Sequence, residues 1–135
     1  MGTAFGEART VPASEEAKRI LKQLVTKHIF DEQRDVWRLG AAIGISRREV
    51  HKGGKRGTFQ NINSLDPDEV LAAAMLGRYP EMTPDARLKQ LVDHAEWGIR
   101  EIGRQVEIGT FDPSKLAVPV ERTREHLAVK RTVGQ

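Results

Sequence analysis

The sequence predicts a mainly α-helical protein, a compact single-domain bundle of about four to five helices with a basic glycine-rich loop. Apolar residues recur in several segments at the three-and-four spacing of one helical face. Residues that commonly start helices precede three of these segments. No segment alternates apolar and polar residues over enough length to require a sheet. At 135 residues, the chain has the size of one domain.

The first helix is expected to begin directly after Ser14. Serine is a preferred N-cap residue, and the two glutamates that follow it suit the positive end of a helix dipole. The apolar positions that would share one face of this helix are Ala17, Ile20, Leu21, Leu24 and Val25.

The second helix is expected to span about residues 31–43. Its inward positions would be Val36, Leu39 and Ile43, while Arg34 and Arg38 would lie on an outer face. Trp37 and Trp97 are expected to be large core residues, because aromatic residues make up only 5% of the chain.

Two further helices are predicted from a capping residue followed by proline. Asp66 with Pro67 would open a helix over about 67–77, and Thr83 with Pro84 would open one over about 84–104. The apolar stripe of the last helix consists of Leu88, Leu91, Val92, Ala95, Ile99 and Ile102.

Strand signals are weak. The pieces TFQNINSL and VEIGTF could each form a short extended segment. The expected organisation is a flexible N-terminus over residues 1–12, a helical domain over 13–110 and a basic C-terminal extension over 111–135.

Several classes of function lack the residues that they need. The chain has no cysteine, which excludes disulfides and thiolate chemistry, and its glycines and lysines do not match a phosphate-binding P-loop. The four histidines are scattered, and Asp93 and Glu96 are expected on the solvent side of the last helix. We therefore expect no enzyme activity, no metal and no cofactor. No segment is apolar enough for a membrane span and no signal peptide is indicated, so a cytoplasmic location is expected.

The charges are segregated along the chain. Residues 34–56 contain seven Lys or Arg against two acids, a net charge of +5, whereas residues 57–114 contain ten acids against five bases. A protein that meets a polyanion benefits from one positive zone that releases counterions from phosphates. This pattern predicts contact with nucleic acid, and an ordinary solvated turn is the alternative.

The stretch SRREVHKGGKRGTF, residues 46–59, is the centre of the positive zone. If Gly44 made the tight turn of a helix-turn-helix, Ser46 would cap a recognition helix that begins with two arginines. Alternatively, residues 51–57 form a flexible basic loop whose glycines let the backbone approach phosphates. Either way, the expected DNA-binding residues are Arg34, Arg38, Arg47, Arg48, Lys52, Lys55 and Arg56.

The run FDEQRDVWRLGAAIGISRRE, followed by the basic glycine-rich connection, resembles the small DndI-like accessory proteins encoded beside bacterial DNA phosphorothioation (Dnd) gene clusters. The resemblance covers about residues 15–105. The residues that carry it are Phe30, Arg34, Asp35, Leu39, Ala41, Ala42, Gly44, Arg47 and Arg48. It implies an auxiliary role, in which the protein holds duplex DNA for the sulfur-inserting complex or links to that complex without chemistry of its own.

The sequence thus predicts a sequence-tolerant double-stranded DNA-binding accessory protein of the phosphorothioation machinery. Its expected partners are duplex DNA and other subunits of that complex, and pairing of two copies stays open. The alternative is a protein-interaction adaptor subunit of a defence or DNA-modification complex that does not contact DNA directly.

Overall fold

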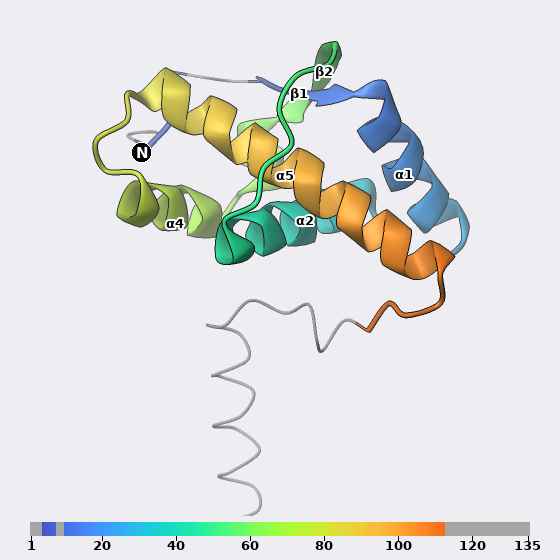
Figure 1. The fold of residues 1–135 in the computed structure, drawn as a ribbon. Helices are drawn as coiled ribbons and strands as arrows, with labels where there is room; N and C mark the ends of the chain where they lie inside the picture. Colours follow the sequence, from blue (N-terminus) through green and yellow to red (C-terminus); the bar gives the residue numbers. More distant parts are fainter. Residues whose placement is uncertain (1–3, 8–9, 113–135) are drawn as a thin grey trace, which may run out of the picture.

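The computed structural model describes residues 4–7 and 10–112, and this part of the chain is mostly helical (Figure 1). The prediction of a mainly α-helical fold is confirmed, and a small two-stranded sheet is added to it. No helix within the described ranges has both the length and the apolar character to cross a membrane. The elements are β1 (Thr10–Ser14), α1 (Glu15–Thr26), α2 (Gln33–Arg47), β2 (Arg56–Asn61), α3 (Ile62–Leu65), α4 (Val70–Arg78) and α5 (Pro84–Glu107).

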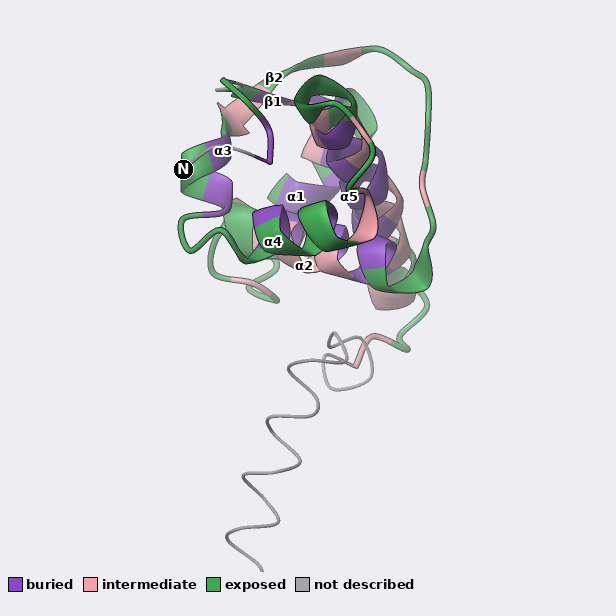
Figure 2. Cartoon of the chain, turned by 90° about the vertical axis from the view of Figure 1, so that its left-hand side faces the viewer, coloured by how far each residue is buried: buried purple, intermediate pink, exposed green. Residues whose placement is uncertain are grey.

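Helix α5 is the centre of the fold. Residues 91–96 are all buried, so this part of the helix has no solvent-facing side. Helices α1, α2 and α4 pack around it, the hairpin of β1 and β2 covers it, and the loop after α2 runs across it (Figure 1). In Figure 2 the buried residues gather on α5 and on the helix faces turned toward it. The core includes Leu21, Trp37, Ile43, Met75 and Ile99, each less than 2% exposed.

Glycines let α2 and α5 approach at backbone distance. A Cβ atom on Gly98 would lie 1.8 Å from the carbonyl oxygen of Gly40, and one on Gly44 would lie 2.3 Å from the carbonyl oxygen of His94. Real Cβ atoms do not come this close to other atoms, so neither position accepts a side chain without moving the helices apart.

The helix-turn-helix interpretation is therefore wrong. Helix α2 continues through Gly44 to Arg47, and residues 49–55 contain no second helix. Arg48 ends α2 in the left-handed conformation, with φ of 59°. Gly44 is required by the packing of α2 against α5 and does not form a turn.

The capping predictions are confirmed for α1 and α5. The Ser14 hydroxyl accepts a hydrogen bond from the Ala17 N–H at 3.0 Å, and the Thr83 hydroxyl accepts one from the Ala86 N–H at 3.2 Å. Both helices begin at the predicted residue, and α5 runs three residues beyond the predicted end.

Asp66 acts differently from the prediction. The short helix α3 ends before it, and α4 begins at Val70 rather than at Pro67. The buried Asp66 carboxylate accepts hydrogen bonds from the N–H groups of Leu71 and Ala72, at 3.0 and 2.9 Å. Asp66 thus pairs with two free backbone N–H groups in the first turn of α4, although it lies further before the helix than its N-cap residue, Glu69.

The sheet is an antiparallel hairpin in which Thr10 pairs with Asn61 and Ser14 with Arg56. Strand β2 overlaps the TFQNINSL segment, whereas VEIGTF begins inside α5 and forms no strand. No sequence signal predicted β1, whose first residues fall within the N-terminus expected to be flexible. Residues 1–3, 8–9 and 113–135, including most of the predicted C-terminal extension, lie outside the described residues.

Candidate nucleic-acid interface

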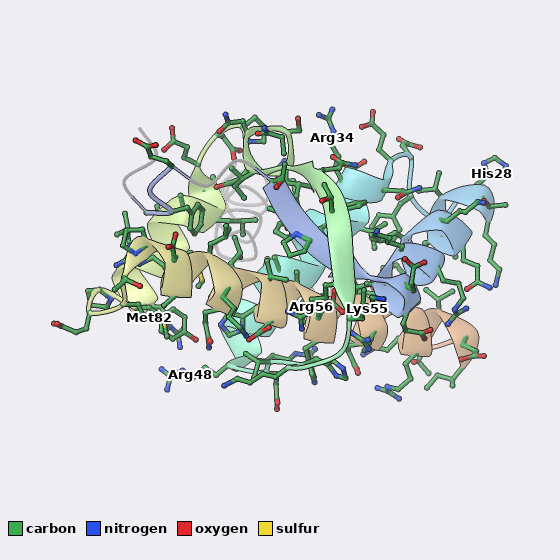
Figure 3. All side chains as sticks on the ribbon, turned by 90° about the horizontal axis from the view of Figure 1, so that it is seen from above. His28, Arg34, Arg48, Lys55, Arg56 and Met82 are labelled. Carbon is green, nitrogen blue, oxygen red and sulfur yellow. The ribbon has the colours of Figure 1, made fainter. Side chains whose placement is uncertain are left out.

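The seven basic residues predicted to bind DNA do not form one surface. Arg34 lies in the first turn of α2 and Arg48 at its C-terminal end, which separates them by about 20 Å along the helix axis. Figure 3 shows Arg34 and Arg48 at opposite edges of the molecule, with Lys55 and Arg56 between them.

The three arginines on α2, all among the seven predicted residues, pair with the protein's own carboxylates. Arg34 Nε lies 2.7 Å from Glu32 Oε1, and Arg38 Nη2 lies 3.2 Å from Asp68 Oδ1.

Arg47 is the third paired arginine on α2. Its Nη1 is 3.9 Å from Glu101 Oε2, and its guanidinium carbon lies 6.0 Å from the centre of the Trp97 ring. These contacts occupy the guanidinium group with protein partners, so Arg47 is less available to a phosphate.

Arg56 is a buried anchor rather than a surface cation. Its side chain is only 11% exposed, and its Nη1 donates to Asp93 Oδ1 at 2.7 Å. Its Nη2 donates to the His51 carbonyl oxygen, also at 2.7 Å. Arg56 therefore ties the loop that follows α2 to the middle of α5.

The expectation that Asp93 and Glu96 coat the solvent side of this helix is wrong, because they are 1% and 2% exposed. The Ser14 backbone N–H and hydroxyl donate to Glu96 Oε2 and Oε1 at 2.9 and 2.7 Å, and Arg100 donates to Oε1 as well. Burial alone would raise the pKa of Glu96, but these three donors hold the pKa below its usual value. This carboxylate joins the start of α1 to α5.

These contacts also account for much of the charge segregation in the sequence. Arg38, Arg47 and Arg56 come from the positive segment 34–56, and their partners Asp68, Glu101 and Asp93 come from the negative segment 57–114. Segregated charges along a chain can thus be paired in the fold, which weakens the inference of a polyanion from their distribution alone.

The remaining cations, Arg48, Lys52 and Lys55, belong to residues 48–55, which we call the basic loop; it runs across α5, and Arg48 and Lys55 lie toward its two ends (Figure 3). All three are exposed, and the structure records no ion pair for them with any described residue. Gly53 and Gly54 between the lysines have φ of 86° and 82°, a conformation that residues with a Cβ rarely adopt.

The basic loop is held at its start and end by buried partners. The Glu49 carbonyl oxygen accepts a hydrogen bond from His94 Nδ1 at 2.7 Å, and the His51 N–H donates to the Asp93 carbonyl oxygen at 3.0 Å. Arg56 holds the other end. Residues 52–55 lie between these anchors, so the lysines are held at a defined place on the surface.

The His94 ring has a definite hydrogen-bonding pattern. Because a carbonyl oxygen only accepts, Nδ1 carries the proton that binds Glu49, and Nε2 then accepts from the Tyr79 hydroxyl at 2.7 Å. Gln90 Nε2 donates to the Tyr79 oxygen at 3.2 Å, which completes the chain. Burial lowers the pKa of His94 and keeps the ring neutral.

A further cation that the sequence did not single out lies beside the basic loop. Lys89 on α5 is 67% exposed, and its Nζ is 3.5 Å from Asp93 Oδ2. It lines an open hollow of about 440 Å³ together with Gly53, Gly54 and Arg56. The only sequence signal that places Lys89 beside the basic loop is its spacing of four residues from Asp93. That signal can be used only once Asp93 is known to face the loop.

No group of His, Asp or Glu side chains in the described ranges is arranged to hold a metal ion.

In comparisons with known proteins, no family model, no curated protein and no solved structure matched the chain.

Proposed function

We propose that the protein binds the phosphate backbone of double-stranded DNA through the basic loop and serves as an accessory protein of the DNA phosphorothioation machinery. The observation that carries the DNA part is the basic loop itself: Arg48, Lys52 and Lys55 are exposed and without recorded ion pairs, on a glycine-containing segment fixed by buried anchors. The phosphorothioation part rests on the sequence resemblance.

The geometry favours sequence-tolerant contact. Reading base edges in the major groove requires an α-helix or a two-stranded ribbon that fits the groove. The basic loop contains neither, whereas lysines and arginines on a loop suit phosphate oxygens, which carry no sequence information directly.

The salt dependence of binding should reflect three contacts rather than seven. The logarithm of the affinity is expected to fall with the logarithm of salt concentration with a slope of about −3 for three phosphate contacts. If all seven predicted residues contacted phosphates, the slope would be about −6.

A fluorescence-anisotropy titration of a labelled duplex tests the proposal. Replacing Arg48, Lys52 and Lys55 by alanine should abolish most of the binding and flatten the salt dependence. The matched control replaces Arg19 and Lys22 on α1 and Lys27 at its C-cap, which removes the same charge from another exposed part of the surface and should leave most of the binding intact. Equal loss in both variants would show that only net charge matters and would contradict the proposal.

The adaptor alternative is supported by a specific observation: Arg34, Arg38, Arg47 and Arg56 already have carboxylate partners within the protein. On this alternative, the wild-type protein shows no salt-dependent binding to duplex DNA, and the triple basic-loop variant still joins its protein complex.

A further inference from the structure

The open hollow beside the basic loop has a mainly apolar floor. Leu88 belongs to the apolar stripe of α5 but is only partly buried. With Val92 on the same face of α5 and Pro12 of β1, it lines the space of about 440 Å³ that also borders the loop. Pockets that bind small organic groups commonly have about 300–1,000 Å³ and mainly apolar walls. The space, which we call the α5 hollow, therefore has the size and the floor of a ligand site.

Two charged groups lie on the α5 side of the hollow. Asp85 and Lys89 both line it and are four residues apart, so they are neighbours on one face of the helix. Asp85 is exposed, and the structure records no ion pair for it with any described residue. Because an ionised carboxylate only accepts hydrogen bonds, Asp85 offers an acceptor to a ligand that carries N–H groups. Lys89 offers a positive charge one turn further along.

Lys89 keeps this charge available although it has a partner. The network that joins the basic loop to α5 contains two buried carboxylates, Asp93 and Glu96. Three cations surround them, Arg56, Lys89 and Arg100, so one positive charge is in excess. Arg56 already binds Asp93 at 2.7 Å, whereas Lys89 Nζ is 3.5 Å from the second oxygen and 67% exposed. An exposed pair of this kind contributes little stability, so Lys89 can exchange its carboxylate for a phosphate oxygen at little cost.

The wall of the hollow on the side of the basic loop is bare backbone. Gly53 and Gly54 line it, and nothing lies within 4 Å of where a Cβ atom would be on either residue. Lys52 and Lys55, which flank these glycines, are exposed and have no recorded ion pair with a described residue. Uncovered backbone lets a ligand approach closely, and the neighbouring lysines supply positive charge beside it.

A nucleotide combines the properties that this hollow can match. Its base is a flat, largely apolar ring with N–H donors at its edge, and its phosphate is an anion. A base inside a duplex cannot use the hollow, because its edge is paired and its faces are stacked, whereas an unpaired base is released at the least cost. We infer that the α5 hollow binds one unpaired nucleotide of a DNA strand.

In the bound state the base lies over Leu88 and Val92, and an N–H group at its edge donates to the Asp85 carboxylate. Lys89 and the lysines of the basic loop bind the phosphates on either side of that base. The inference rests on the proposed function, because the basic loop must first hold the DNA beside α5. It adds to that function a preference for DNA in which one base is unpaired.

Fluorescence-anisotropy titrations of the full chain with three duplexes of one sequence test this inference. The first duplex is fully paired, the second carries a single unpaired cytosine, and the third carries an abasic site in place of that cytosine. The protein should bind the cytosine-bulge duplex about tenfold more tightly than the paired duplex. The abasic duplex has the same interrupted backbone without a base and should bind like the paired duplex. Equal binding of the two bulges would show that a bent backbone is recognised instead of a base and would overturn the inference.

Filling the hollow should remove the preference and keep the binding. Leu88→Trp places an indole in the α5 hollow, so the variant should bind the paired duplex as the wild type does and no longer favour the cytosine bulge. The matched control is Leu76→Trp, since Leu76 is 37% exposed on α4 and does not line the hollow. This control should retain the preference. A preference that survives Leu88→Trp would place the base elsewhere.

Asp85→Ala tests the same site without changing a partly buried residue. Its replacement removes the acceptor for the base, so the preference for the cytosine bulge should fall severalfold at an unchanged melting temperature. Glu81→Ala removes another exposed acid that lies just before α5 and does not line the hollow, and it should leave the preference unchanged. An equal effect of the two substitutions would reflect net charge alone and would contradict the role of Asp85.

Failure of this inference can be distinguished from failure of the proposed function. Equal affinity for all three duplexes would overturn the inference and leave the proposed function standing. Absence of binding to all three would overturn both. Displacement of the cytosine-bulge duplex by micromolar free deoxycytidine monophosphate would assign the hollow to a soluble nucleotide and overturn its assignment to a DNA strand.

Discussion

Gly98 in α5 lies directly against the backbone of Gly40 in α2, so that a Cβ on Gly98 would be 1.8 Å from the Gly40 carbonyl oxygen. This contact sets the distance between the two helices that bury most of the core. It also explains why α2 passes through two glycines without breaking, because the packing they permit outweighs their low helix propensity.

Gly98→Ala is therefore expected to lower the free energy of unfolding by about 3 kcal/mol, since the added methyl group must push backbone away rather than a flexible side chain. Gly77→Ala adds the same methyl group to open space and should raise the free energy of unfolding by up to about 1 kcal/mol. Urea denaturation at low protein concentration measures both. Similar small effects from the two substitutions would show that the helices do not pack at backbone distance.

Arg56 and Lys55 are neighbours in the sequence, but their alanine substitutions are expected to affect different properties: stability for Arg56 and duplex binding for Lys55. Arg56→Ala leaves the buried Asp93 carboxylate without its main partner and should destabilise the protein by about 3–5 kcal/mol. Lys55→Ala removes an exposed cation and should change stability by less than about 0.5 kcal/mol while weakening duplex binding. Thermal denaturation and anisotropy on both variants separate the roles. Wild-type stability in Arg56→Ala would contradict the role of Arg56 as a buried anchor.

The helices that could be predicted were those with local signals. Ser14 and Thr83 cap their helices through atoms only three residues away, and the apolar stripes of α1 and α5 depend only on spacing. A glycine carries no such information, because it suits both a tight turn and a close helix contact. Only the position of α5 against α2 shows which of these Gly44 makes.

The candidate site depended on contacts between distant parts of the chain, so the sequence indicated it only in part. Asp93 and Glu96 are buried because β1, β2 and the basic loop cover that side of α5, and β1 gave no sequence signal. Their partners, Arg56 and Ser14, lie 37 and 82 residues away. The structure leaves Arg48, Lys52 and Lys55 exposed, and their role in binding DNA stays a prediction.

The Glu96 carboxylate should make the free energy of unfolding depend on pH in the acid range. Its pKa in the folded protein is below the ordinary value of 4.5, so the unfolded chain binds its proton first as the pH falls. The stability that it contributes is complete above about pH 4.5 and is lost as the pH falls through the lower folded pKa. Glu96→Gln should reduce stability at pH 7 and show a weaker loss below pH 4.5.

The comparison for Glu96 is Glu16→Gln. Glu16 also has a lowered pKa, through its hydrogen bonds to Arg19, but its side chain is 48% exposed and screened by solvent. Its replacement should change the acid unfolding curve little. Equal effects at the two positions would mean that burial of Glu96 beside Ser14 adds nothing.

His94 should give a second pH dependence, nearer to neutrality. Burial lowers its pKa from 6.5, so the unfolded chain takes up a proton at a higher pH than the folded protein does. Its neutral ring is matched by a donor at Tyr79 and an acceptor at Glu49, an arrangement that protonation of Nε2 disturbs. The free energy of unfolding should thus be constant above about pH 7 and decline as the pH falls below 6.5.

Equilibrium denaturation of the wild-type protein and of His94→Asn between pH 7.5 and about 5 measures this dependence. Asparagine keeps an N–H donor for the Glu49 carbonyl oxygen but does not titrate, so the variant should be less stable at neutral pH and should lose the slope below pH 6.5. The control is His51→Asn, because His51 is exposed and only its backbone carbonyl oxygen accepts the hydrogen bond from Arg56; this variant should retain the slope. A slope that persists in His94→Asn would assign the titration to another group.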